Sequence, residues 1–315
     1  MSYNCIFLIG PTAVGKTAIG VRLARALSGE IISADSRQVY KGLDIGSGKD
    51  LSDYNLGGEH IPYHLIDVCT LEKEYNLFDF QEGFYESFGI ISERGKLPIC
   101  VGGTGMYVDS ILRKYDMIPV PENKEMEAEL FKKELPELER ILIEEKEKIH
   151  NTTEFGDKER VIKAIIINRF NKSDECRKIR QSLNRPKICP LVIGTTLERS
   201  LVRERIAKRL KDRMEEGMIE EVRSLHEKGA SWERLESLGL EYRFVSEFLQ
   251  GKIGSMEKLI ELLGLAIGQF AKRQETWFRG MEKKGVKIHW LPKEPDIEAR
   301  FRAALELCER ERAAE

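Results

Sequence analysis

The stretch Gly10-Pro-Thr-Ala-Val-Gly15-Lys16-Thr17 decides the fold, because it matches the phosphate-loop pattern G-x-x-x-x-G-K-[ST] in suitable surroundings. It follows an apolar run rich in β-forming residues (4–9) and opens a segment, 16–27, whose apolar residues recur at helical spacing. The sequence therefore predicts a strand, a loop and a helix, with a phosphate group held at the N-terminus of the helix.

Each part of this loop has a chemical reason. Its glycines let backbone N–H groups converge on phosphate oxygens, Lys16 adds a full positive charge, and the Thr17 hydroxyl is suited to hold Mg²⁺. We expect a diphosphate or triphosphate to contact the residues Gly10, Pro11, Thr12, Ala13, Val14, Gly15, Lys16 and Thr17. Cleavage of a nucleoside triphosphate would further need an acid at the end of a neighbouring buried strand. Asp67 is the comparable acid and leaves a P-loop kinase or ATPase open.

The rest of the pattern predicts an α/β fold, a P-loop NTPase-like parallel sheet flanked by helices. Strand-like apolar runs alternate with a helical segment in the first third of the chain, which is typical of a parallel sheet covered on both faces. We expect strands at 30–34, 64–68, 97–101, 187–194 and 286–291, and helices at 77–94, 197–225, 235–249 and 257–279.

A change in composition predicts a second domain. Pro119 and Pro121 open a stretch, 122–148, that is dense in Glu and Lys and carries Leu and Ile at helical spacing. Strand character returns only after Pro186. We therefore expect a catalytic core formed by residues 1–118 and 187–315, and a helical insertion over residues 119–186.

Composition limits the possible partners. With 41% hydrophobic and 33% charged residues, the chain can bury a full core, and it lacks an apolar run of the ~18 residues that a membrane span needs. We expect a cytoplasmic protein without a leader or membrane contact. The net charge of −2 gives no global attraction to nucleic acid, so RNA binding would require local clusters of Lys and Arg. The six cysteines form no CxxC pair, which argues against disulfides or zinc.

Polar residues near the phosphate loop each have two interpretations. Asp35 follows the second predicted strand, at the edge of a parallel sheet where ligands bind, but an Asp before Ser also caps turns. Arg205 and Arg209 share one helix face, which is either functional or simply solvated. Thr104 follows Gly102-Gly103 and needs no role beyond the turn. Spacing alone leaves these alternatives open.

Taken together, these strings resemble the tRNA dimethylallyltransferases, also called tRNA isopentenyltransferases. The resemblance covers the phosphate loop and continues in the family's order along the chain, through residues 33–46, 64–67, 101–107, 205–209, 239–243 and 271–277. It implies transfer of a dimethylallyl group from dimethylallyl diphosphate to N6 of the adenosine next to the anticodon (position 37) in tRNA, with release of diphosphate.

The resemblance also implies roles for individual residues. Asp35 accepts a proton from the attacking amine, Thr104 contacts the target nucleotide, and Arg209, with Arg205 beside it, stabilises the leaving diphosphate together with Mg²⁺. The helical insertion contacts the anticodon stem-loop, and the enzyme is expected to be a monomer. The implied tRNA contacts are Asp35, Ser36, Arg37, Gln38, Thr104, Glu159, Arg160, Lys163, Gln269, Lys272 and Arg273.

The chain departs from the family pattern at two basic positions. Lys163 stands where the family has Arg, and Gly268 stands where the block 268–274 usually begins with Arg, so the catalytic match is better than the RNA-binding match.

Two alternatives remain beside this interpretation. Relatives that prenylate free AMP or ADP share the catalytic residues, but a nucleotide-sized acceptor would require neither the insertion nor the basic pair Lys272 and Arg273. A small-molecule kinase is the second alternative, because a fold does not fix a function.

Overall fold

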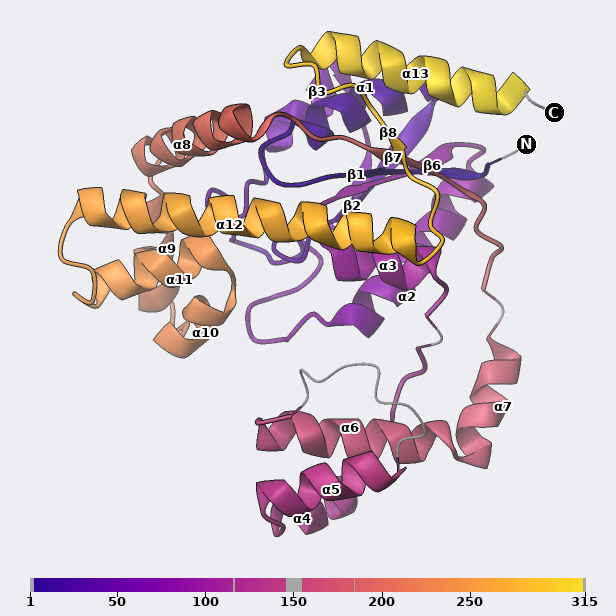
Figure 1. The fold of residues 1–315 in the computed structure, drawn as a ribbon, viewed down its shortest axis with the longest axis vertical. Helices are drawn as coiled ribbons and strands as arrows, with labels where there is room; N and C mark the ends of the chain where they lie inside the picture. The colour runs from indigo at the N-terminus through magenta and orange to yellow at the C-terminus, as the bar shows by residue number, and fades with distance from the viewer. Residues whose placement is uncertain (1–2, 116, 146–154, 184, 314–315) are drawn as a thin grey trace. The chain divides into compact units, whose positions relative to one another are not determined.

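The computed structural model describes residues 3–115, 117–145, 155–183 and 185–313 of the 315-residue chain. The chain forms two compact units (Figure 1). The core unit consists of residues 1–115 and 186–315, and the insertion unit consists of residues 116–185. These boundaries lie within three residues of those expected from the change in composition.

A parallel sheet organises the core unit and confirms the predicted α/β class. It has six strands in the order β5-β2-β6-β1-β7-β8, and every pair of neighbours runs parallel. Because the strands are parallel, their carboxyl ends meet at one edge and bring the following loops together. The strands are β1 (Cys5–Ile9), β2 (Gly29–Ala34), β5 (Tyr63–His64), β6 (Leu97–Gly102), β7 (Pro190–Gly194) and β8 (His289–Trp290).

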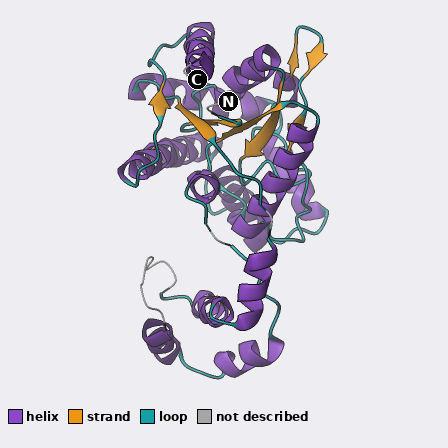
Figure 2. Ribbon diagram, turned by 90° about the vertical axis from the view of Figure 1, so that its right-hand side faces the viewer, coloured by secondary structure: helices purple, strands orange, loops and turns teal. Residues whose placement is uncertain are grey.

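Helices cover both faces of the sheet (Figure 2), because successive side chains of a strand point to opposite sides. Ile6 and Leu8 of β1 pack with the helices α1 (Lys16–Leu27) and α13 (Ile297–Ala313). Phe7 and Ile9 pack on the other face, with α2 (Leu77–Glu93), α3 (Gly105–Leu112) and the C-terminal half of α12 (Met256–Lys283). The central strand is therefore buried on both sides, as its continuous apolar sequence predicts.

A second helical layer packs beside the sheet edge. Its core joins the first half of α12 to α8 (Arg199–Glu215), α9 (Met218–Glu227), α10 (Trp232–Ser237) and α11 (Leu240–Leu249). The prediction of one helix over 197–225 was wrong, because Gly217, with φ of +100°, ends α8 and starts α9. Gly239, with φ of +130°, likewise separates α10 from α11. The helices α3 and α13 were not predicted.

The loops at the carboxyl edge pack closely against neighbouring backbone. A Cβ atom at Gly10, just after β1, would lie 2.1 Å from the carbonyl oxygen of Thr195. A Cβ atom at Gly102, the last residue of β6, would lie 2.2 Å from the carbonyl oxygen of Ala34. Only glycine fits at these two positions. Glycine therefore allows the end of β1 to lie close to the end of β7, and the end of β6 to lie close to the end of β2.

The expected strand over 64–68 is mostly absent. The strand β5 ends at His64, and Leu65 and Asp67 adopt positive φ angles of 62° and 56°, which a strand does not allow. The apolar run Leu65-Ile66 is nevertheless buried, which explains its strand-like appearance in the sequence. Beside β5, where the ring centroids of Tyr63 and His60 lie 5.8 Å apart, Asn55–Leu56 (β3) and Glu59–His60 (β4) form a separate antiparallel pair.

The insertion unit is helical, as expected. Its core contains Leu130, Leu138, Leu142, Val161, Ile162 and Ile165. Arg169 forms a bidentate contact with Glu145, with an Nη2 to Oε1 distance of 2.6 Å. Residues 146–148 of the expected helical stretch lie outside the described residues. The helices are α4 (Lys124–Phe131), α5 (Leu135–Glu145), α6 (Lys158–Asn171) and α7 (Asp174–Ser182).

Within the described part of the chain, none of the helices combines the length and the apolar character that crossing a membrane requires.

Candidate active site

A cavity of about 940 Å³ opens in the core unit where the loops after β1, β2 and β6 meet. Residues of α8, α11 and α12 complete its wall. The predicted site residues that line it are Thr12, Ala13, Gly15, Lys16, Thr17, Asp35, Ser36, Arg37, Gln38, Thr104, Arg205, Arg209 and Arg273. Residues from distant parts of the sequence thus share one cavity.

Other predicted residues lie elsewhere. Gly10, Pro11 and Val14 do not line the cavity, and the Val14 side chain is buried in the helical layer. Gln269 and Lys272 line a separate hollow of about 620 Å³ along α12, which Arg273 shares. Glu159, Arg160 and Lys163 belong to α6 of the insertion unit.

The phosphate loop is held from several sides. The N–H group of Thr12 donates to Oε1 of Gln274 at 2.9 Å, and Nε2 of Gln274 donates to the carbonyl of Gly103 at 2.8 Å. Arg209 donates from Nη2 to the Thr12 hydroxyl at 2.6 Å. Lys16 donates from Nζ to the carbonyl of Pro11 at 2.6 Å. The ammonium group of Lys16, which is expected to bind a phosphate, is thus held by a carbonyl of its own loop.

Positive charge is concentrated at this loop. Burial of the Lys16 ammonium lowers its pKa to about 8; the carboxylate of Asp35 opposes this effect and the charge of Arg209 adds to it. Burial, followed by the charge of Arg213, also lowers the pKa of Arg209 to about 10. Crowded cations of this kind are costly when no anion is bound, so the arrangement favours a polyanionic ligand such as a diphosphate.

Three arginines of α8 line the cavity at intervals of one helical turn: Arg205, Arg209 and Arg213. Arg205 donates to the carbonyl of Pro295 at 2.8 Å, and the nearly buried Arg213 lies 3.9 Å from the carboxylate of Glu241. The cavity-facing interpretation of Arg205 and Arg209 therefore agrees with the geometry better than a fully solvated face does.

Asp35 combines the two alternatives that the sequence left open. Its Oδ1 atom accepts a hydrogen bond from the N–H group of Arg37 at 2.9 Å, which is the expected turn contact. The residue also lines the cavity beside the phosphate loop. Thr104 holds the same segment, because its hydroxyl accepts a bond from the Ser36 N–H group at 3.0 Å. One carboxylate can thus stabilise the turn and face a ligand.

The loop that follows this segment is fixed by the partly buried carboxylate of Glu221. The carboxylate of Glu221 accepts hydrogen bonds from the N–H groups of Asp44, Ile45 and Gly46 at 2.9, 2.7 and 3.1 Å. Tyr242 donates to the same carboxylate at 2.8 Å, and burial, followed by the charge of Glu221, raises the pKa of Tyr242. The segment therefore presents Gly46, Ser47 and Gly48 to the cavity in a defined shape.

Asp67, the acid that a kinase or ATPase would use, is occupied elsewhere. It forms an ion pair with Lys49, whose buried ammonium also contacts Oδ1 of Asp44 at 2.9 Å and the carbonyl of Tyr40 at 2.6 Å. Asp67 does not line the cavity. Its observed role is to neutralise a buried lysine.

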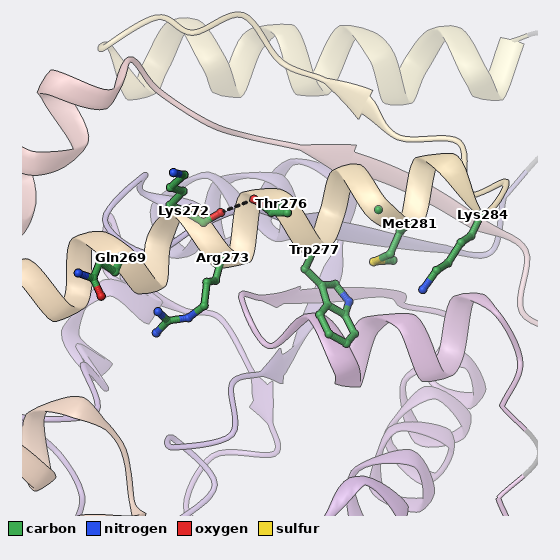
Figure 3. Close-up of a pocket in the computed structure, with 8 residues that line it drawn as sticks. Gln269, Lys272, Arg273, Thr276, Trp277, Met281 and Lys284 are labelled. Carbon is green, nitrogen blue, oxygen red and sulfur yellow. Dashed lines mark hydrogen bonds between the residues drawn. The ribbon is translucent and has the colours of Figure 1, made fainter. Parts of the chain in front are cut away.

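The hollow along α12 carries a basic and aromatic face. Figure 3 shows Arg273, Trp277 and Lys284 projecting toward the same side of the helix, whereas Lys272 projects to the opposite side. Trp277 packs at the start of α3, where a Cβ atom on Gly105 would lie 2.3 Å from its Cδ1 atom. Arg273 and Trp277 also line the larger cavity and so connect the two hollows.

Comparison with known proteins agrees with this geometry. The family model "IPP transferase" matches residues 38–281, and the model "Isopentenyl transferase" matches residues 3–61. The chain belongs to the IPP transferase family.

Individual IPP transferases resemble the chain over nearly its whole length. It is 53% identical to tRNA dimethylallyltransferase 2 of Treponema denticola, over 92% of this chain and 96% of the relative. It is 48% identical to tRNA dimethylallyltransferase 1 of Syntrophus aciditrophicus, over 92% of this chain and 94% of that one. The crystal structure of the full-length tRNA isopentenylpyrophosphate transferase from Bacillus halodurans has a TM-score of 0.70 at 29% identity, covering 98% of this chain and 96% of that one.

Among the residues of this IPP transferase site that sequence reasoning missed are Arg213, Gln274 and Trp277, and it also missed Arg300 of α13, which bonds to the phosphate loop at the Val14 carbonyl. Arg213 continues the spacing of Arg205 and Arg209, so the helical period could have identified it. Gln274 and Trp277 lie in the stretch 271–277 that carries the family resemblance, which implied no role for either residue. Arg300 gave no signal, because the helix that carries it was not predicted.

The low pKa of Lys16 predicts a pH dependence. Lys16 is charged below about pH 8 and neutral above it, and a bound diphosphate favours the charged form. We expect the affinity of the wild-type protein for inorganic diphosphate to fall by about tenfold from pH 7 to pH 9.

Titration calorimetry with Lys16→Met as the control measures this effect. The variant should bind diphosphate about 100-fold more weakly and should retain only the titration of the ligand itself. Identical pH profiles for the two proteins would show that Lys16 does not titrate on binding.

Proposed function

We propose that this IPP transferase moves a dimethylallyl group from dimethylallyl diphosphate to N6 of an adenosine next to the anticodon (position 37) of tRNA, releasing diphosphate. One observation carries the proposal: the Asp35 carboxylate lines the same cavity as a phosphate loop crowded with cations. This arrangement pairs a group that accepts a proton with a site for a diphosphate leaving group. The names of the curated relatives support the same reaction.

The chemistry follows from these two groups. An adenine amine is a poor nucleophile, so a carboxylate that accepts its proton while the N–C bond forms lowers the barrier. The C–O bond to the diphosphate breaks, and negative charge grows on the departing oxygens. In the proposed reaction Lys16, Arg209 and the loop N–H groups stabilise that charge, because electrostatic groups held in advance by the fold act most strongly where charge grows toward the transition state.

Mg²⁺ is part of the proposal. Among the described residues there is no group of three or more His, Cys, Asp or Glu side chains able to hold a metal ion. Mg²⁺ commonly keeps its waters and binds through one or two protein groups plus substrate phosphates, so the Thr17 hydroxyl at the cavity wall fits this mode. The ion would neutralise charge on the leaving diphosphate.

The tRNA acceptor is supported by features that a free nucleotide would not require. The insertion unit presents Arg160 and Lys163 on α6, and the core unit presents Lys272 and Arg273 on α12. Trp277 lines the same hollow as Lys272 and Arg273 and offers an aromatic surface on which a base can stack. The proposal also keeps two predictions from the sequence, a monomeric state and a cytoplasmic location.

The direct test measures transfer from dimethylallyl diphosphate in the absence of nucleoside triphosphate. We expect N6-prenylated adenosine in tRNA digests analysed by mass spectrometry, and no product with AMP or ADP as the acceptor. Prenylated AMP without prenylated tRNA would instead identify an adenylate isopentenyltransferase. Phosphate transfer from ATP would identify a kinase.

Asp35→Asn tests the proposed proton acceptor. The side chain keeps its shape and can still accept the bond from the Arg37 N–H group, but it is no longer a base. We expect kcat to fall by ~10²- to 10⁴-fold with little change in affinity for tRNA or dimethylallyl diphosphate. Single-turnover rates and thermal melting are measured on the same preparation. A lower melting temperature with a normal rate would show that Asp35 stabilises the turn and does not accept the proton.

The proposed RNA surface predicts a salt dependence. If Lys163, Lys272 and Arg273 contact phosphates, each one that is removed should lower the slope of log affinity against log salt by about 1. The measurement compares the wild type with the triple alanine variant by filter binding of tRNA over a range of salt concentrations. Arg302→Ala, on the exposed face of α13, serves as the matched control. An unchanged slope in the triple variant would remove these residues from the RNA surface.

A further inference from the structure

Arg300 connects the C-terminal helix to the phosphate loop. Its side chain is fully buried, although it comes from α13, far from the loop in sequence. Its Nη1 atom donates to the carbonyl of Val14 at 2.6 Å and to the hydroxyl of Thr195 at 3.0 Å. Thr195 follows β7, and its N–H group bonds to the carbonyl of Ile9 at the end of β1 at 2.8 Å. Arg300 is therefore anchored to the strand ends from which the loop begins.

The bond to Val14 determines the direction of the next amide. The described chain contains no cis peptide, so the C=O group of Val14 and the N–H group of Gly15 point in opposite directions across one planar unit. Because Arg300 holds the Val14 carbonyl on the buried side, the Gly15 N–H group is turned away from the guanidinium. Gly15 lines the cavity.

The second nitrogen of the guanidinium is also directed at this position. Nη2 of Arg300 is buried without a hydrogen-bond partner among the residues that the structure describes. A Cβ atom on Gly15 would lie 3.6 Å from it, and Gly15 has a φ angle of +81°. A full positive charge thus lies directly behind the peptide that faces the cavity. The energetic cost of an unpaired buried donor suggests a function beyond packing.

We propose that Arg300 is a positioning residue for the diphosphate site, aiming the Gly15 N–H group at the leaving diphosphate and supporting its charge from behind the loop. The inference rests on the proposed function, because it concerns the same phosphate loop. It makes the C-terminal helix a part of substrate binding. Arg300 acts through Gly15 and does not itself touch the substrate.

The test compares Arg300→Met and Arg300→Lys with Arg302→Met as the matched control. Arg302 lies on the same helix, and its exposed side chain pairs only with Glu298 among the contacts of the described chain. Calorimetry gives the affinity for inorganic diphosphate in the presence of Mg²⁺, and steady-state kinetics gives the KM for dimethylallyl diphosphate and for tRNA.

We expect Arg300→Met to weaken diphosphate binding and to raise the KM for dimethylallyl diphosphate by ~10- to 100-fold, on the scale of a lost charge-assisted hydrogen bond. The KM for tRNA should change by less than about twofold. Arg300→Lys, which retains the charge and can reach one acceptor, should fall between the wild type and Arg300→Met. Arg302→Met should match the wild type.

Several outcomes would overturn the inference. A purely structural role would lower the melting temperature of Arg300→Met while leaving the diphosphate affinity of the folded protein unchanged. Arg300→Lys covers the case in which the methionine variant does not fold, and wild-type diphosphate affinity in that lysine variant would equally refute the proposal. If the wild-type protein itself neither binds diphosphate nor transfers a prenyl group, the proposed function fails, whereas normal wild-type behaviour with unchanged Arg300 variants refutes only the role of Arg300.

Discussion

The amide of Gln274 makes two hydrogen bonds on which the geometry of the cavity depends. Its oxygen accepts from Thr12 in the phosphate loop, and its nitrogen donates to Gly103 in the turn after β6. A buried amide satisfied at both ends fixes the distance between the segments that it joins. The phosphate loop, the turn that carries Thr104, and α12 are thereby held as one unit, and Thr104 extends this unit to the Asp35 segment through its bond to Ser36. A change in Gln274 would disturb all of these segments together.

Charge is the second constraint on the site. Lys16, Arg209 and Arg213 lie close enough for burial and mutual repulsion to lower the pKa values of Lys16 and Arg209. Such a cluster is held in place by the fold, because Val14 of the phosphate loop and the apolar side of α8 are both buried in the core of the helical layer. The stability of those helices offsets the cost of keeping cations together without an anion, and a bound diphosphate relieves that cost.

Local patterns made the fold around the phosphate loop predictable. The expected helix over 16–27 has the observed bounds, and the strands after it begin and end within a few residues of their predicted positions, except for the run over 64–68. That run failed because buried apolar residues look alike whether they form a strand or an irregular segment with positive φ. The insertion was found through its composition. The helix α13 was missed because many of its residues are charged and only a few are buried, among them Ala304, Leu307 and Cys308, so its apolar periodicity is weak.

The candidate site was predictable where residues were close in sequence or shared a helical period. The phosphate loop met the first condition, whereas Asp35 and the pair Arg205 and Arg209 were assigned to the site through the family resemblance, because spacing alone left a turn role and a solvated helix face open; all three line the cavity together with residues of the loop. The contacts of Gln274 and Arg300 depend on how distant helices dock, which periodicity does not encode. The same limit applies to Asp67. Its ion pair with Lys49 depends on the folded structure, and no pattern in the sequence indicated that Lys49 would be its partner.

The order of these contacts along the chain has a consequence for biosynthesis. The phosphate loop is synthesised before Gln274, which holds Thr12 and follows about 260 residues later, and that interval takes roughly 13–50 s at ~5–20 residues per second. During that interval the nascent loop lacks the partner that fixes its shape. The insertion unit is continuous in sequence and has its own apolar core, so it can fold while the catalytic cavity still awaits the C-terminal helices. A nascent chain halted before α12 would therefore carry the whole phosphate-loop motif without a formed diphosphate site.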